Sequence, residues 1–95
     1  MATHYMNIEV KRWVYMDMQE KAQRYNRTLL WEAVNDTLQY AKSFRVSGHK
    51  IAETEKAVQF DLYFWNLRKA GRYVTDAPVE GGWKVWIPKS AIIKM

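Results

Sequence analysis

The chain has no cysteine and only two histidines among its 95 residues. The absence of cysteine excludes disulfide bonds, thiolate nucleophiles and cysteine metal sites, and it is consistent with a reducing cytoplasm. His4 and His49 stand far apart and outside any histidine–carboxylate cluster, so a zinc site has little support. We therefore expect the protein to use no metal and no other cofactor.

Long apolar runs are also absent. No segment approaches the roughly 18 to 20 apolar residues that a membrane-spanning helix needs. The first residues, "MATHYMNIEVKRW", lack the apolar stretch of a secretory signal. These absences predict a cytoplasmic protein without a membrane partner. The length of the chain predicts one domain, residues 1–95, built around a single core.

Large aromatic side chains and positive charge are what the chain has in quantity. It contains five tryptophans, six tyrosines and three phenylalanines, and apolar residues make up 48% of the sequence. Fifteen basic and ten acidic residues give a net charge of +5. This charge is spread along the chain. It favours polyanions through counterion release, and it is equally typical of a small basic protein that binds none.

The first half of the sequence predicts a helix that follows a poorly alternating strand in "YMNIEVKRWVYM". Asp17 with Glu20 three residues later forms a capping-box pattern, which predicts the start of a helix. Apolar residues then recur at helical spacing as far as Ala41. We expect residues 17–42 to be helical. They form either one bent helix or two helices that meet near "YNRT", where Asn26 or Thr28 caps the second.

The second half, from Gly48 onward, predicts strands. In "KAVQFDLYFW" every second residue from position 58 to position 64 is strongly apolar, which is typical of a strand with one buried face. Pro78, Gly81 and Gly82 predict a loop. "WKVWI" predicts a strand that Pro88 ends, and "SAIIKM" predicts a last short strand.

This order of elements predicts an α+β fold. The amphipathic helix would pack on a C-terminal antiparallel meander, or on a small partly open barrel of roughly three to five strands. Residues 1–47 would form the mainly helical part of the domain and residues 48–95 the β part.

Two short segments, "ETEKAV" (residues 53–58) and "VWIPKSAI" (residues 85–92), resemble a pattern in small, mostly uncharacterised bacterial and phage proteins. There, a strand reading like Glu-Thr-Glu-Lys-Ala is followed by one reading Trp-Ile-Pro-Lys-Ser. The resemblance covers the C-terminal half and implies a β-rich module whose two strands pair. It implies a phage or mobile-element protein in the cytoplasm of a bacterial host cell, and it assigns no activity.

Residues suited to catalysis are few. The pair Gly81 and Gly82 lacks the Lys-Ser/Thr and the helix that follow a phosphate-binding loop. Glu53 and Glu55 would share one face of a strand, where two carboxylates can hold a metal or share a proton. An exposed strand edge, kept polar to resist edge-to-edge pairing, explains them better. We expect no enzyme activity.

Basic and aromatic residues alternate in the second half and predict a binding surface. The predicted contact residues are Tyr63, Trp65, Arg68, Lys69, Arg72, Lys84, Trp86 and Lys89. Such residues stack on unpaired bases and neutralise phosphates, and they are also enriched in protein interfaces.

Two functions therefore stay open. One is a non-enzymatic phage or mobile-element accessory protein that binds and modulates another protein or nucleoprotein complex, such as an anti-CRISPR-like inhibitor of a host defence complex. The other is a nucleic-acid-binding module. A homodimer that covers the aromatic face is a further alternative.

Overall fold

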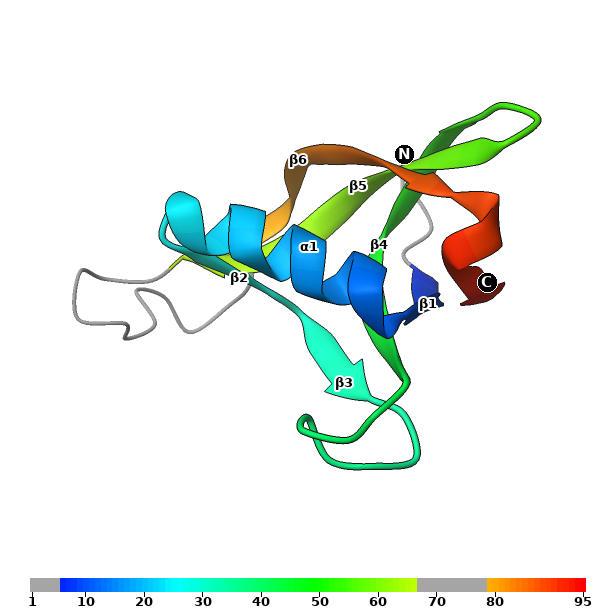
Figure 1. Cartoon of the computed structure of the whole chain (residues 1–95). Helices are drawn as coiled ribbons and strands as arrows, with labels where there is room; N and C mark the ends of the chain where they lie inside the picture. The colour runs from blue at the N-terminus through cyan, green and yellow to red at the C-terminus, as the bar shows by residue number, and fades with distance from the viewer. Residues whose placement is uncertain (1–5, 67–78) are drawn as a thin grey trace.

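The computed structural model describes residues 6–66 and 79–95, which form one α-helix and seven strands (Figure 1). In chain order these are β1 (Met6–Lys11), α1 (Arg12–Arg24), β2 (Arg27–Leu29), β3 (Trp31–Ala33), β4 (Ser43–Glu53), β5 (Ala57–Asn66), β6 (Val79–Pro88), the short 3-10 helix η1 (Lys89–Ala91) and β7 (Ile92–Lys94). The fold class is α+β, as the sequence predicts.

The seven strands form one open sheet, and every strand pair in the described part of the chain is antiparallel. β4 lies at the centre and pairs with β1 along one edge. Along its other edge β4 pairs first with β3 and then with β5. β5 continues beyond β4 to pair with β2. The β4–β5 hairpin therefore opens, and the segment that carries β2 and β3 enters the gap.

Gly48 marks the point where the hairpin opens, because Gly48 and Leu62 form its last pair. A Cβ atom on Gly48 would lie 2.6 Å from the carbonyl oxygen of Asp61 and 3.1 Å from the Cα of Leu62. Both neighbours are backbone atoms, so no side chain can move to relieve the contact. Just beyond this point, the Leu30 N–H donates to the carbonyl oxygen of Tyr63 (3.4 Å).

The core lies between α1 and one face of the sheet. α1 crosses in front of the strands in Figure 1 and contacts β1, β2 and β4. The helix buries Val14, Tyr15, Met18 and Ala22. No helix in the described residues is both long and apolar enough to cross a membrane.

Ring contacts and one glutamine fix α1 against the inserted segment. The Tyr15 ring stacks on Phe44 of β4, with centroids 4.0 Å apart, and Trp31 of β3 lies against both rings. One turn further along α1, Gln19 Nε2 donates to Thr28 Oγ1 (2.6 Å) and Gln19 Oε1 accepts from the Leu29 N–H (3.0 Å). These contacts connect the helix to β2, β3 and β4.

The predicted start of the helix at Asp17 is wrong. α1 begins five residues earlier, and its N-cap residue, Lys11, makes no side-chain capping hydrogen bond. Asp17 and Glu20 lie inside the helix, where they form ion pairs with Lys21 (3.1 Å) and Arg24 (2.8 Å) one turn later. The two acidic residues whose spacing resembles a capping box therefore form ion pairs with basic residues four positions later in the helix.

The predicted continuation of the helix to residue 42 is also wrong. Asn26 adopts a left-handed backbone conformation (φ 56°) directly after the C-cap residue, Tyr25, and such a residue commonly ends a helix. Asn35 is left-handed as well (φ 59°), and Asp36 Oδ1 accepts from the Thr37 N–H in the adjoining turn. Neither one bent helix nor a second helix forms.

The strand predictions for the second half are closer to the structure. Val58, Phe60, Leu62 and Phe64 are buried on β5, as their alternation predicts, and β6 ends at Pro88. Three predictions need correction. Gly48 lies inside β4 and does not begin the β part, β6 runs through Gly81 and Gly82, and the sheet has seven strands. The helix does not rest on a C-terminal meander alone, because β1, β2 and β3 come from the first half.

We predict that Gly48→Ala destabilises the protein by about 1–3 kcal/mol, the usual cost of overpacking against atoms that cannot yield. Urea unfolding followed by circular dichroism measures this change. Ser90→Ala, at an exposed position, should shift the free energy of unfolding by less than about 0.5 kcal/mol. Equal stability of Gly48→Ala and the wild type would contradict the close approach of β4 and β5.

Candidate macromolecule-binding groove

The structure separates the predicted contact residues. Arg68, Lys69 and Arg72 lie outside the described residues. Tyr63 is buried, and its hydroxyl shares a hydrogen bond with His49 Nε2 (3.0 Å). Tyr63 therefore belongs to the packing of the sheet and not to an open surface. The remaining four residues, Trp65, Lys84, Trp86 and Lys89, lie in three different places.

Lys84 and Trp86 line a groove of about 510 Å³ between α1 and β6, which we call the α1–β6 groove. Its helix side consists of Asp17, Met18, Lys21, Arg24 and Tyr25, and its strand side of Trp83, Lys84, Val85 and Trp86. Side chains of successive strand residues point to opposite faces of a sheet. Because four successive residues of β6 line the groove, it follows the edge of the strand and not one of its faces.

β6 is an edge strand, since it pairs only with β5 within the described residues. Gly81 and Gly82 have positive φ angles of 110° and 94° and shift the register between β5 and β6. The Asp61 carboxylate holds this irregular turn, because its Oδ1 accepts from the N–H groups of Gly82 (2.6 Å) and Trp83 (2.9 Å). These hydrogen bonds thus fix the backbone at the start of the strand side of the groove.

Aromatic and cation–π contacts join the two walls at one end of the groove. The Trp83 ring meets the Phe64 ring edge-on, with centroids 6.1 Å apart. The Arg27 guanidinium lies 4.4 Å from the centre of the Phe64 ring and 5.9 Å from that of Tyr25. Trp83 and Val85, which alternate with Lys84 and Trp86 along β6, are partly buried against the core. Trp86 is left 49% exposed.

The groove carries more positive than negative charge. Lys21 and Arg24 are paired with Asp17 and Glu20. Lys84 forms no ion pair with any residue that the structure describes. Among the described residues that line the groove, Lys84 is therefore the basic one without an ion-pair partner, and it lies next to the half-exposed ring of Trp86.

Lys89 lies outside this groove and has a different partner. Together with Lys50 it forms ion pairs with the Glu53 carboxylate, and its N–H donates to the Lys56 carbonyl oxygen (2.8 Å). The two lysines lower the pKa of Glu53 from its usual 4.5 to about 2, through hydrogen bonds and charge. The ion pairs of Glu53 thus connect the β4–β5 turn to the residues that follow β6. Glu55 lies in that turn.

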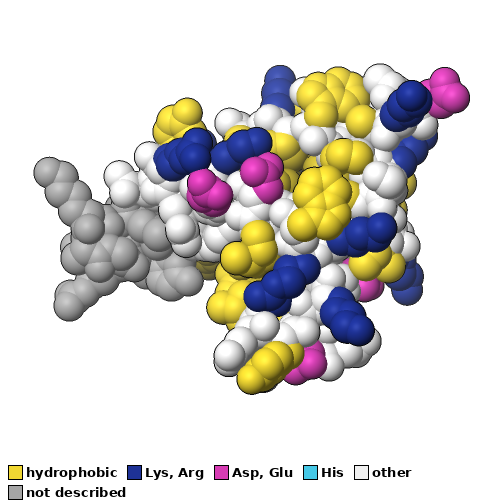
Figure 2. Space-filling model, viewed as in Figure 1, with side chains coloured by type: hydrophobic (Ala, Val, Ile, Leu, Met, Phe, Trp, Pro, Cys, Tyr) yellow, Lys and Arg dark blue, Asp and Glu magenta, His cyan; other side chains and the backbone are white. Residues whose placement is uncertain are grey.

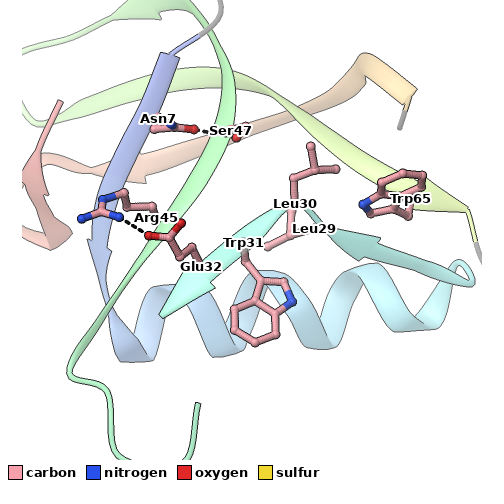
Figure 3. A pocket seen from close by; sticks show the side chains of 8 residues that line it. All are labelled: Asn7, Leu29, Leu30, Trp31, Glu32, Arg45, Ser47 and Trp65. Atoms are coloured by element: carbon pink, nitrogen blue, oxygen red, sulfur yellow. Dashed lines mark hydrogen bonds and ion pairs between the residues drawn. The ribbon is translucent and has the colours of Figure 1, made fainter. Parts of the chain in front are cut away.

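Trp65 lines a separate hollow of about 490 Å³ where β2 and β3 enter the sheet. Asn7, Arg45, Ser47 and Trp65 alternate with core residues on β1, β4 and β5 and so belong to the face opposite α1. Two other lining residues lie on the α1 side, since Leu29 belongs to the core and Trp31 contacts Tyr15 of α1. Figure 3 shows Trp65 on one side of the hollow and the Arg45–Glu32 ion pair on the other, with Leu29 and Leu30 between them. Ser47 Oγ donates to Asn7 Oδ1 (2.7 Å) in the same hollow. Its charged groups are therefore already paired with each other.

Sequence reasoning missed the helix side of the α1–β6 groove. Lys21, Arg24 and Tyr25 recur at i, i+3 and i+4, a spacing that places them together on a helix surface. The prediction of residues 17–42 as helical, in one bent helix or in two, gave no reason to set that surface beside residues 83–86. The geometry of the groove depends on α1 ending before β2, which the apolar pattern of the sequence does not indicate.

No family model matches the chain, and comparisons with curated proteins and with solved structures found no match. The proximity of "ETEKAV" and "VWIPKSAI" is nevertheless a feature of the fold, since Ala57 pairs with Pro88 and Val58 with Ile87. The resemblance to small bacterial and phage proteins stays a prediction.

We predict that the ion pairs of Glu53 make stability depend on pH in a defined window. Because the pKa of Glu53 is lowered to about 2 in the folded state, its charge stabilises the fold fully above pH 4.5 and loses this effect as the pH falls towards 2. Between these values the unfolded chain binds more protons at this site, so stability rises with pH.

The measurement is urea unfolding of the wild type and Glu53→Gln at several pH values. The difference in the free energy of unfolding should be largest near neutral pH and should vanish near pH 2. It should also shrink in high salt, since all three charges are at least partly exposed. A difference that stays constant across this window would contradict the assigned ion pairs.

Proposed function

We propose that the protein is a non-enzymatic binding protein that holds an extended segment of a partner protein in the α1–β6 groove and so modulates that partner. The observation that carries this proposal is the outer edge of β6, which pairs with no other strand in the described residues and from which four successive residues line the groove. The edge of a strand presents backbone N–H and C=O groups that another extended chain can pair with.

The side chains of the groove suit this mode of binding. Backbone pairing supplies affinity, while pockets for side chains supply specificity. Trp86 and Tyr25 expose large rings beside the strand, and tryptophan and tyrosine are enriched among the residues that dominate interface energies. The Asp61 hydrogen bonds hold the start of the groove in place before a partner arrives, which reduces the entropy lost on binding.

The charge of the groove favours a partner segment with acidic residues. Among its lining residues one acidic side chain, Asp17, accompanies three basic ones, Lys21, Arg24 and Lys84. Lys84 contributes most to this preference, because it has no ion-pair partner among the described residues. Charged groups at the rim of an interface act chiefly on partner choice and on the rate of association.

Single-stranded nucleic acid is the second candidate ligand. The observation that favours it is the position of the exposed Trp86 ring beside Lys84, since bases stack on aromatic rings while cations follow the phosphates. Pairing with the edge of β6 needs backbone N–H and C=O groups, which nucleic acid lacks, so we place the protein segment first. Inhibition of a host defence complex is one form of the proposed function, and it rests on the resemblance in residues 53–58 and 85–92.

We predict that Trp86→Ala and Lys84→Glu weaken partner binding, the tryptophan variant by about tenfold or more, because large aromatic side chains dominate interface energies. The wild type and both variants are immobilised and used to capture proteins from a bacterial lysate. Captured proteins are then titrated individually. Tyr40→Ala, an exposed aromatic outside the groove, is the matched control and should bind like the wild type. Equal affinity of all four forms for the captured partner would refute the groove as the binding site.

The nucleic-acid alternative has its own measurement. Fluorescence anisotropy with labelled single-stranded DNA, single-stranded RNA and duplex DNA is recorded over a series of salt concentrations. Binding through phosphates should weaken linearly on a log–log scale as salt rises. Tight binding with this slope, lost in Lys84→Glu, would favour nucleic acid over a protein segment. No binding at low salt would remove nucleic acid as a ligand.

A further inference from the structure

A second surface lies at the opposite end of α1 from Tyr25. Trp13 and Met16 of the first helical turns and Ile93 of β7 enclose an apolar hollow of about 690 Å³ with Lys11 and Lys42. We call these five residues the Trp13 patch. Trp13 is 59% exposed, Met16 47% and Ile93 51%. Figure 2 shows hydrophobic side chains reaching the surface beside Lys and Arg side chains on the face where α1 lies.

The apolar residues of the Trp13 patch do not belong to the hydrophobic core of the described residues. The buried side of α1 is formed by Val14, Tyr15, Met18 and Ala22. Trp13 and Met16 are three residues apart, so they share another stripe of the helix surface. That stripe meets Ile93 near the end of the chain. An exposed cluster of large apolar side chains around a hollow, rather than a scatter of single ones, is typical of an interaction site.

Every charged residue that lines the hollow is basic. The Arg12 guanidinium is held in place, since it donates to the carbonyl oxygens of Leu38 and Ala41 (2.8 Å each). Lys11 and Lys42 form no ion pair with any residue that the structure describes. The hollow therefore combines apolar walls with two lysines at its rim that have no ion-pair partner in the described part of the chain.

We propose that the Trp13 patch docks a segment of a partner protein in which a large apolar side chain is flanked by aspartate or glutamate. The apolar side chain fills the hollow between Trp13, Met16 and Ile93, and the carboxylates meet Lys11 and Lys42. Charge complementarity selects this occupant. A second copy of the chain would bring lysines against lysines, because a symmetric interface places each surface against its own equivalent.

This surface is distinct from the α1–β6 groove. Trp13 and Tyr25 are twelve residues apart along α1, which corresponds to roughly 18 Å at 1.5 Å per residue. A partner that occupies both sites must therefore run along the exposed side of the helix. The proposal does not rest on the function proposed for the groove.

The test is a selection of random short peptides, displayed on phage, against the folded wild-type protein. Enriched peptides are synthesised with a fluorescent label and titrated by anisotropy against wild type, Trp13→Ser and the charge-reversed double variant Lys11→Glu/Lys42→Glu. We expect enriched peptides with an aromatic or leucine side chain beside acidic residues. We expect both variants to weaken their binding by about tenfold or more. Circular dichroism confirms that each variant is folded.

Matched controls separate this site from the groove. Trp86→Ser and Lys84→Glu should bind the same peptides like the wild type. Peptides that lack acidic residues, or that bind Trp13→Ser as tightly as the wild type, would overturn the proposal. Self-association of the protein in sedimentation would also overturn the proposal, if Trp13→Ser abolishes it and no acidic peptide binds. Cosedimentation with phosphatidylserine vesicles would overturn the proposal under the same two conditions.

Discussion

At Gly48 the backbones of β4 and β5 come so close that a Cβ atom would lie 2.6 Å from the carbonyl oxygen of Asp61. Beyond this point the two strands separate, and residues 27–33 enter between them, pairing first with β5 and then with β4. The inserted segment satisfies backbone groups that the open hairpin would otherwise leave unpaired. It also carries Trp31 to the stacked rings of Tyr15 and Phe44.

The insertion also affects where the two proposed binding surfaces lie. Because β2 must begin beside the end of β5, α1 ends at Arg24, and Tyr25 is left next to Arg27 and Phe64. The end of the helix thus faces β6 across the α1–β6 groove, while its beginning carries Trp13 and Met16 to β7. A single short helix that is buried on one side thereby offers two exposed ends: Tyr25 lies near Trp86 and Lys84 of β6, and Trp13 lies near Lys11 and Lys42.

The sequence predicts those parts of the fold in which local pattern and tertiary packing agree. Residues 58 to 64 alternate because one face of β5 is buried, and Pro88 ends β6 because it has no N–H to donate. Residues 28–41 show the opposite case: their apolar spacing is helical, yet residues 28–29 pair with β5 and residues 31–33 pair with β4, which outweighs that preference. Asn26 was a usable signal for the end of the helix. Asparagine can end a helix by adopting the left-handed conformation, and it can also start one as an N-cap residue. Of the predicted contact residues, Lys84 and Trp86 could be placed from strand alternation, whereas their helix neighbours could not.

The central structural claim is that residues 27–33 are strands inserted into an open hairpin, and nuclear Overhauser effects measured by NMR test it most directly. The structure predicts cross-strand effects between the backbone protons of Thr28 and Trp65 and between those of Glu32 and Arg45. A helix in this segment would instead give effects between residues three apart from position 28 to position 41. That helical pattern, without the two cross-strand contacts, would contradict the fold and the position of both surfaces that depend on it.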